Sequence, residues 1–340
     1  GVQNTLIGGL AGDAITTGTA NVAVGYLSLS ASTTGTDNVA LGRSALASST
    51  TASNNIAIGR NALILNTTGA NNIAIGYGSM FANTTGNSNV AMGYNSLTSD
   101  TLGDRAVAIG LNALSSQNFT SSTDNYNVGI GYAAGGSVTT AIHNTLIGGL
   151  AGNSLTTGGG NTIMGYAAGD ALTEGNSNVA VGRSALSTDT LGDRAVAVGY
   201  GALNAQNFVS DTDNYNTAVG FYAGNLVTTG LKNTLMGGSA GNELTTGDSN
   251  VIIGYLSGSS GTNLTTGTGN VLLGSDADAS ASDSDYANVI GYDVTGAGGY
   301  TTLGKSGDDI RAAHGTATWA TVSDERYKKD IVDSTAGLSF

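Results

Sequence analysis

The stretch NNIAIGYGSMFANTTGN, residues 71–87, decides the fold, because closely similar phrases recur through most of the chain. It holds an apolar pentapeptide that ends at Gly76, a short step through Met80, and a Thr-Thr-Gly segment that ends at Gly86. A unit repeated at a fixed short spacing is typical of a solenoid. The glycine that ends the pentapeptide, called position 0 below, recurs 17 residues apart with two steps of 21: Gly8, Gly25, Gly42, Gly59, Gly76, Gly93, Gly110, Gly131, Gly148, Gly165, Gly182, Gly199, Gly220, Gly237 and Gly254.

Three further columns keep the register of this glycine. Asn occupies position −4, as in Asn72, Leu or Met occupies position +4, as in Met80, and a second Gly occupies position +10, as in Gly86. The residues before position 0 alternate β-branched side chains with Ala, which predicts a short β-strand, and Gly recurs too often for a helix. We expect a second short strand ending near position +4, turns at both glycines, and a ladder of stacked Asn amides.

The composition excludes several classes of protein. Gly makes up 54 of 340 residues, Pro and Cys are absent, and charged residues are only 10%. The absence of Pro suits a chain that forms β-ladders along its length, and the absence of Cys excludes disulfides and thiolate chemistry. The net charge of −13 opposes a nucleic-acid partner, and no apolar run is long enough to insert into a membrane.

The distribution of apolar residues predicts an assembly of several chains. In each unit the large apolar residues, such as Val22, Val24 and Leu29, lie close together, and the Ser/Thr/Gly half has none. One chain is expected to leave this apolar face against water, whereas identical chains wrapped around one axis would bury it. The predicted fold is all-β: a repeat solenoid that forms a homotrimeric parallel β-roll or β-helix rod. About 18 coils of ~17 residues, ~4.8 Å apart, give a rod on the order of 80 Å long.

The repeat divides the chain into three parts. Residues 1–304 form the predicted solenoid shaft, residues 305–322 a connector, and residues 323–340 the start of a different C-terminal domain. The two 21-residue steps insert extra residues and predict bulge loops near 117–127 and 206–216, within a block of coils that returns 89 residues later. The duplication indicates that the unit tolerates being lengthened by whole coils.

The units NVALGRSAL at residues 38–46 and NVAVGRSAL at 178–186 resemble the head repeats of trimeric autotransporter adhesins, and the same unit recurs in bacteriophage tail fibres. The resemblance covers roughly residues 4–304. It implies a parallel β-roll of three chains. The main alternative to a phage fibre is therefore a bacterial surface adhesin of the autotransporter type, and a third is a single-chain ice-binding solenoid that uses the Thr-Thr-Gly column.

The C-terminal residues favour the phage tail fibre among these classes. SDERYKKDI at residues 323–331 is similar to the opening pattern of the intramolecular chaperone (peptidase S74) domain that ends many phage tail fibres and tailspikes. That resemblance implies self-cleavage between Ser323 and Asp324, with Ser323 as the nucleophile and Lys328 as its base. A Ser hydroxyl needs such a base because it is a weak nucleophile while it keeps its proton. Apart from this single cut, the chain is not expected to be an enzyme.

The bulge loops carry the candidate receptor contacts. Aromatic and Asp or Asn side chains can stack on a sugar and hydrogen-bond to it, and the alternative is that these aromatic rings pack on a neighbouring coil. The candidates are Phe119, Asp124, Asn125, Tyr126, Phe208, Asp213, Asn214 and Tyr215.

Other polar features are interpreted as structural. A stripe of Tyr and Arg at position +1 is expected to cover the strand from outside, with recognition as the alternative. The neighbours Asp104 and Arg105 are expected to form a surface ion pair, and so are Asp193 and Arg194.

No cofactor or metal site is predicted. The two His residues are isolated and Cys is absent, which opposes a zinc site. The Asp-rich residues 275–285 are interpreted as a solvated loop, with Ca²⁺ binding as the alternative.

The sequence thus predicts a phage tail-fibre shaft, located at the virion tail and extracellular. Its expected partners are two identical chains, other phage tail proteins, and a host cell-surface glycan or protein. The rod is expected to space or present a receptor-binding element.

Overall fold

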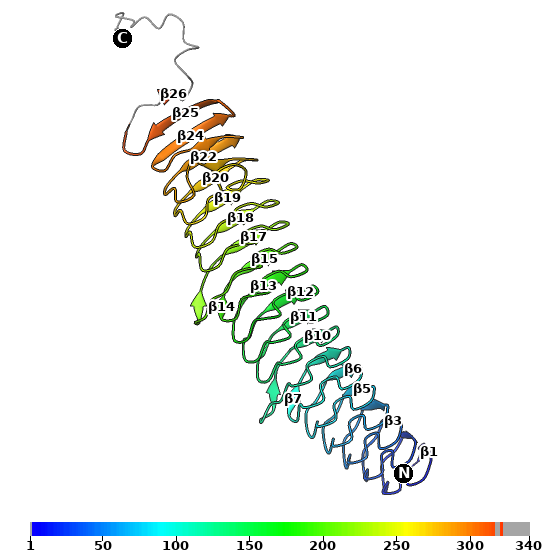
Figure 1. Ribbon diagram of the computed structural model, residues 1–340. Helices are drawn as coiled ribbons and strands as arrows, with labels where there is room; N and C mark the ends of the chain where they lie inside the picture. The colour runs from blue at the N-terminus through cyan, green and yellow to red at the C-terminus, as the bar shows by residue number, and fades with distance from the viewer. Residues whose placement is uncertain (1, 317–319, 322–340) are drawn as a thin grey trace, which may run out of the picture.

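The chain forms a long parallel β-solenoid that winds coil upon coil from one end of a rod to the other (Figure 1). The computed structural model describes residues 2–316 and 320–321, and every regular element in this part of the chain is a β-strand. A search of these residues for a helix able to cross a bilayer found none. The all-β repeat fold expected from the 17-residue spacing is confirmed.

Within the described residues, eighteen short strands stack in parallel, one per coil, and each pairs with the strand of the next coil. Neighbouring strands lie ~4.8 Å apart, so the stack is ~80 Å long. These strands are β1 (Thr5–Ile7), β2 (Val22–Val24), β3 (Val39–Leu41), β4 (Ile56–Ile58), β5 (Ile73–Ile75), β6 (Val90–Met92), β8 (Val107–Ile109), β10 (Val128–Ile130), β11 (Thr145–Ile147), β12 (Thr162–Met164), β13 (Val179–Val181), β15 (Val196–Val198), β17 (Thr217–Val219), β18 (Thr234–Met236), β19 (Val251–Ile253), β20 (Val271–Leu273), β22 (Asn288–Tyr292) and β24 (Tyr300–Lys305).

The sheet ends in an antiparallel turn. β25 (Asp308–Ala313) runs antiparallel to β24, and β26 (Ala320–Thr321) runs antiparallel to β25. Part of the predicted connector, residues 305–322, is therefore β-structure that continues the sheet. The hairpin pairs with the last strand of the parallel stack, whose backbone groups would otherwise form an open edge.

Each three-residue strand points its middle side chain into its own coil and the two flanking side chains away from it. Ala74 is fully buried, whereas Ile73 and Ile75 are only partly covered. Leu29, expected on the same exposed face as Val22, is fully buried. A single chain thus closes a narrow core of its own from Ala, Leu, Ile, Val and Met side chains, which corrects the expectation that one chain lacks the residues to do so.

Two kinds of coil fill this interior with opposite residues. In the first kind, position −2 is Ala and position +4 is Leu or Met, as in Ala40 and Leu46. In the second kind, position −2 is Leu or Ile and position +4 is Gly, as in Leu146 and Gly152. A Cβ added to Gly152 would lie 2.9 Å from Leu146 Cδ2, so the glycine makes room for the leucine of its own coil. Coils of both kinds thereby keep the dense packing that protein interiors require. The coil with Gly129 and Gly135 belongs to neither kind, and Leu114 and Leu146 of the adjacent coils take up its space.

The two repeat glycines are required for different reasons. Gly76 has a φ of 131°, and a Cβ there would lie 2.4 Å from the carbonyl oxygen of Gly93. Gly86 does not have a left-handed φ, but its Cβ would lie 2.4 Å from the carbonyl oxygen of Gly103 in the next coil. The second strand expected near Met80 is instead a turn, in which Met80 has a φ of 51°. Close approach of adjacent coils therefore selects glycine as much as turn geometry does.

The Asn ladder expected at position −4 is confirmed. Asn72 is fully buried, its backbone N–H donates to Asn55 Oδ1 at 2.9 Å, and its Nδ2 donates to the Gly86 carbonyl oxygen at 2.8 Å. The N–H of Asn89 donates in turn to Asn72 Oδ1 at 2.9 Å. Each amide satisfies backbone groups of adjacent coils that would otherwise be buried without partners.

Candidate functional site

Two lateral loops interrupt the regular coils where the sequence predicts bulges (Figure 1). The first lateral loop is residues 117–127 and the second is residues 206–216, five coils further along. At ~4.8 Å per coil, the loops are ~24 Å apart along one edge of the rod. The short parallel strand pairs that mark them are β7 (Gly103–Asp104) with β9 (Thr123–Asp124), and β14 (Gly192–Asp193) with β16 (Thr212–Asp213).

A buried carboxylate anchors the base of each loop. Asp100 Oδ1 accepts the N–H of Gly103 at 3.0 Å and that of Phe119 at 3.2 Å, and Asp100 Oδ2 accepts Nε2 of Gln117 at 2.6 Å. Asp189 repeats these three contacts in the second loop. The N–H donors replace the water that a carboxylate loses on burial. Sequence reasoning missed both residues, although each sits in the repeat register at position +7.

Four of the eight candidate receptor contacts lie inside the rod, which corrects that part of the prediction. Phe119 and Phe208 are only 5% and 6% exposed, and Asn125 and Asn214 are fully buried. The two rings are packed against the coils, as the alternative interpretation expected. None of the four presents its side chain at the surface of this chain.

The buried side-chain amides of the loops explain why Asn is replaced by Ala at position −4 in the coil before each loop. Position −4 holds Ala106 in the coil that precedes the first loop. Asn125 Nδ2 donates to the Asp104 carbonyl oxygen at 2.7 Å, and Asn125 Oδ1 accepts the N–H of Asn127 at 2.9 Å. Asn127 Nδ2 donates to Gln117 Oε1 at 2.9 Å. Asn125 and Gln117 thus take over hydrogen bonds that the ladder makes elsewhere.

The other candidates are exposed and form a charged and aromatic cluster on each loop. In the first loop, Arg105 forms an ion pair with Asp124, and its guanidinium lies 5.7 Å from the centre of the Tyr126 ring. Tyr126 stacks in turn on His143, with 5.8 Å between the ring centres. Arg105 therefore pairs across the loop with Asp124, and the expected pair with Asp104 does not form.

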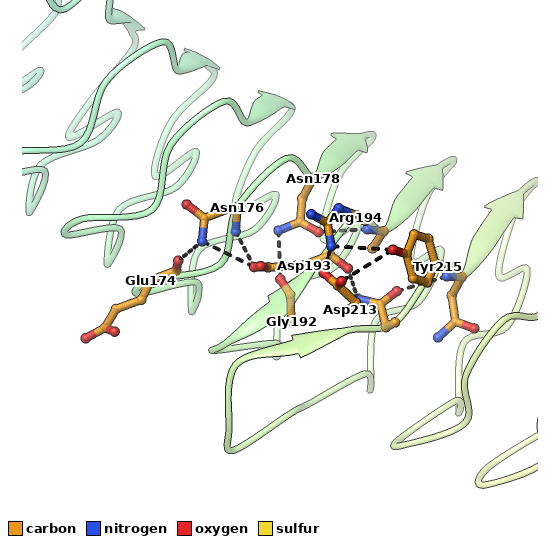
Figure 2. Close-up of polar contacts among 11 residues, drawn as sticks. Glu174, Asn176, Asn178, Gly192, Asp193, Arg194, Asp213 and Tyr215 are labelled. Carbon is orange, nitrogen blue, oxygen red and sulfur yellow. Dashed lines mark hydrogen bonds and ion pairs between the residues drawn. The ribbon is translucent and has the colours of Figure 1, made fainter.

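The second loop repeats the contacts among Arg, Asp and Tyr (Figure 2). Arg194 forms an ion pair with Asp213, its guanidinium lies 5.7 Å from the Tyr215 ring centre, and Tyr215 Oη donates to Asp213 Oδ2 at 3.3 Å. Lys232 holds the place that His143 holds beside the first loop. Ion pairs this exposed contribute under ~1 kcal/mol each, so these clusters add little to the stability of the rod.

The second loop differs from the first in bringing two carboxylates together. Asp193, expected to pair with Arg194, is buried instead, and its Oδ1 accepts the backbone N–H of Asn176 at 2.6 Å (Figure 2). Burial, and then the neighbouring Asp211 carboxylate, raise the pKa of Asp193 above its ordinary value. The first loop has Ser122 where the second has Asp211, and Ser122 donates its hydroxyl at 2.7 Å to the matching carboxylate.

A surface hollow of about 200 Å³ lies beside the second loop, lined by Thr157, Glu174, Asn176, Leu191 and Asp211. The first loop has hydroxyl residues at the positions of Glu174 and Asp211. Carboxylate and amide oxygens of this kind can accept hydrogen bonds from the hydroxyl groups of a ligand such as a sugar. Among the residues that the structure describes, no three His, Cys, Asp or Glu side chains are grouped as metal ligands.

The Asp-rich residues 275–285 are partly built into the shaft. Their strand β21 (Asp278–Ala279) pairs with β23 (Thr295–Gly296). Asp278 is only 1% exposed and accepts the N–H of Gly261 at 2.7 Å, and burial raises the pKa of this carboxyl. This corrects the solvated-loop interpretation for Asp278.

The Tyr and Arg residues at position +1 form the exposed stripe expected from the sequence. Tyr77 and Tyr94 stack with 5.2 Å between ring centres, and the Arg60 guanidinium lies 5.7 Å from the Tyr77 ring centre. Tyr200 and Phe221 stack in the same way at 5.4 Å. These contacts run along the rod from coil to coil, while the outer parts of the rings stay exposed.

The residues of the predicted cleavage, Ser323, Asp324 and Lys328, lie outside the described residues. Comparisons of the chain with protein-family models, with curated proteins and with solved structures found no match. The fold therefore rests on the repeat and on the strand ladder themselves.

Proposed function

We propose that this chain is the shaft of a bacteriophage tail fibre, formed by three identical chains that pack their outer strand faces around a common axis. The observation that supports the proposal is an apolar stripe on the outer face of the long sheet. It is continuous at position −1 of successive strands and is widened by Val or Ile at position −3 of most strands. Large side chains of this stripe keep more than a third of their surface exposed, as in Val22, Leu41, Met92, Met164, Met236 and Ile290.

A stripe of this length favours cover by partner chains. Contiguous apolar patches larger than a few hundred Å² are rare on monomeric proteins. Fully burying one large apolar side chain is worth ~1.5–3 kcal/mol, and such positions recur along the whole rod. Because each chain already fills its own interior, the outer face alone calls for partners. Three copies with one apolar face each can close a core around a threefold axis.

A threefold rod of ~80 Å would space or present a receptor-binding element at the virion tail, attached to other tail proteins. The lateral loops would offer Asp124, Tyr126, Asp213 and Tyr215 to a host cell-surface glycan or protein. Tyr rings can stack on sugar rings, and carboxylates can accept hydrogen bonds from sugar hydroxyls.

The proposal includes one self-cleavage, which is supported by the resemblance of residues 323–331 to the chaperone domain. Hydrolysis of the peptide bond between Ser323 and Asp324 consumes one water, leaves a carboxylate on Ser323 and frees the amine of Asp324. Ser323 would act as the nucleophile and Lys328 as its base.

Denaturing gels of unboiled and boiled chain, combined with intact mass spectrometry, test both parts. We expect a trimer band before boiling, and loss of residues 324–340 from the wild type but not from Ser323→Ala. Ser334→Ala is the matched control and is expected to be cut like the wild type. A chain that runs as a monomer and keeps its full mass would overturn both parts.

A further inference from the structure

The apolar stripe has two rims. The first rim is the column at position −5, which precedes each strand, and the second rim is the column at position +1, which follows it. Side chains of both rims are exposed in most coils, on either side of positions −3 and −1. Any chain that covers the stripe must also meet its rims.

In eight of the seventeen coils from Gly8 to Gly291, a small residue on one rim accompanies a large residue on the other. Where the second rim is Gly, the first rim has a long side chain: Gln3 with Gly9, His143 with Gly149, and Lys232 with Gly238. Where the first rim is Gly, Ala or Ser, the second rim has Tyr or Arg in five coils of six: Ala20 with Tyr26, Ser88 with Tyr94, Gly160 with Tyr166, Ser177 with Arg183, and Ser249 with Tyr255. The sixth coil, Gly269 with Ser275, is small on both rims.

In one coil the two rims carry opposite charges. The coil with Asp37 on its first rim has Arg43 on its second. Seven further coils have a large residue on both rims. Four of them lie beside the lateral loops, where the first-rim residues Arg105 and Arg194 pair with the loop residues Asp124 and Asp213. The other three are Asn54 with Arg60, Asn71 with Tyr77, and Tyr286 with Tyr292.

Contacts inside one chain run along each rim and not between the rims: His143 stacks on Tyr126, and the Tyr166 ring lies beside Gly149. The strand and the apolar stripe separate the two rims of a coil, and within the described residues no hydrogen bond, ion pair or ring contact joins them. Gly149 shows the point most clearly. It does not have a left-handed φ, and a Cβ there would lie 3.5 Å from Tyr166 Cδ2, an ordinary contact. The chain's own backbone and packing therefore do not require glycine at this position.

The first rim carries long side chains at two positions with a left-handed backbone. His143 and Lys232 have φ angles of 62° and 59°, in the left-handed region that Gly and Asn adopt most readily. Both occur in coils whose second rim is Gly. Their size thus correlates with the opposite rim, and Lys232 goes against the local backbone preference, since Asn, Asp and His are the non-Gly residues enriched in this region.

We infer that the two rims meet between neighbouring chains, the first rim of one chain against the second rim of the next, coil by coil. This inference rests on the proposed threefold rod. A symmetry axis parallel to the rod places equal coils of the three chains at one height, so residues of the same coil become partners across the interface. His143 of one chain then fills the space left by Gly149 of the next.

The rims supply a register that the apolar stripe lacks. The stripe presents a large apolar residue at position −1 of every coil, so sliding one chain by one coil would leave an apolar face against an apolar face. The same slip would bring His143 against Tyr132 or Tyr166, and Lys232 against Phe221 or Tyr255. The rims therefore fix the axial register and exclude an antiparallel neighbour, which would scramble the matched coils.

Cross-linking of the cysteine-free chain tests the inference. His143→Cys with Gly149→Cys, treated with a short bis-maleimide, is expected to give a covalent trimer on a reducing denaturing gel, since each chain links to both neighbours. The matched control, His143→Cys with Gly238→Cys, is five coils out of register and is expected to stay uncross-linked. Light scattering before the reagent is added reports the assembly independently.

The outcomes separate the two proposals. A trimer by light scattering that gives no covalent trimer with the matched pair overturns the rim inference and leaves the threefold rod standing. Equal cross-linking of the matched pair and the control overturns the register. A monomer by light scattering overturns the threefold rod and the inference built on it.

A size swap tests the same contact without cross-linking. Gly149→Tyr is expected to raise trimer dissociation about 10-fold or more by crowding His143, and adding His143→Gly is expected to restore the trimer. The chain itself accepts rings at this position in successive coils, as in Tyr77 and Tyr94. Ser154→Tyr, on the opposite wall of the coil, is the control. A Gly149→Tyr trimer as tight as the wild type contradicts the inference.

Discussion

Coils such as Ala40–Leu46 and coils such as Leu146–Gly152 enclose the same space with the large side chain on opposite walls. In the first kind, a turn Leu reaches toward a strand Ala, and in the second, a strand Leu reaches toward a turn Gly. Position +7 compensates as well, being Ser49 in one coil and Leu155 in the other. The strands pair in one unbroken parallel register through both kinds. The fold thus depends on the volume enclosed by each coil, not on one residue type in one column.

The largest decrease in local stability should follow from truncating the buried side chain of a coil of the first kind. Leu46→Ala leaves a cavity beside Ala40, and truncating a buried Leu in this way costs ~2–5 kcal/mol. Hydrogen exchange of the β3 amides and of the strands beside it measures the local opening free energy. Leu65→Ala, at an exposed Leu of the next coil, is the control and should change it by under ~0.5 kcal/mol. Equal losses in the two variants would contradict the assignment of Leu46 to the interior.

A smaller decrease in local stability should follow from adding a large side chain to the interior of a coil of the second kind. Gly152→Leu crowds Leu146 and is expected to lower the local opening free energy by ~1–3 kcal/mol. The backbone itself accepts the change, because Leu46 has a φ of 52° and Gly152 one of 57°.

Converting the whole coil should recover part of that loss. Leu146→Ala, Gly152→Leu and Leu155→Ser together reproduce the interior of the coil with Ala40 and Leu46. Hydrogen exchange of β11 and its neighbours should show better protection in the triple variant than in Gly152→Leu alone. Equal or worse protection would mean that the two coil kinds are not interchangeable by volume.

The smallest change in stability is expected at the lateral loops. The second lateral loop has Asp211 at the position where the first lateral loop has Ser122. Because the pKa of Asp193 is raised in the folded chain, the folded loop holds that proton more tightly than the unfolded chain does. The stability of the second loop should then fall as the pH rises above 3.8, the ordinary value for Asp, toward the raised value. Asp211→Ser removes one cause of the raised pKa and should weaken this dependence.

Hydrogen exchange of β14 and β16 at acid and neutral pH, corrected for intrinsic rates, measures this effect. Ser122→Asp in the first loop is the reciprocal variant and should introduce the dependence in β7 and β9. Protection of β14 and β16 that responds to pH equally in wild type and Asp211→Ser would show that Asp211 plays no part.

The features that repeat in register were predictable from the sequence. The spacing of Gly76, the Asn column through Asn72 and the short strand between them all appear in the structure as expected. Each is a local requirement that every coil imposes on itself and on the next, so the same residue recurs. The bulge loops were predictable for the same reason, since they break the spacing.

The direction in which side chains point was harder to predict. The alternation in Ile73, Ala74 and Ile75 identifies two faces of a strand but does not say which one is enclosed, because that depends on how tightly the coil closes. Ala74 lies inside because the opposite wall supplies the large side chain, Met80. Phe119 was misplaced for a similar reason, since its burial depends on contacts with other coils, and the inserted segment gives no local sign of them.

The mass of the chain in solution tests the threefold rod most directly. Sedimentation equilibrium of the uncleaved Ser323→Ala chain over a range of protein concentrations should give a single species of about 100 kDa, three chains of 33.5 kDa each. A species that stays at 33.5 kDa at every concentration would show that the outer apolar face needs no partner chain, and would contradict the account.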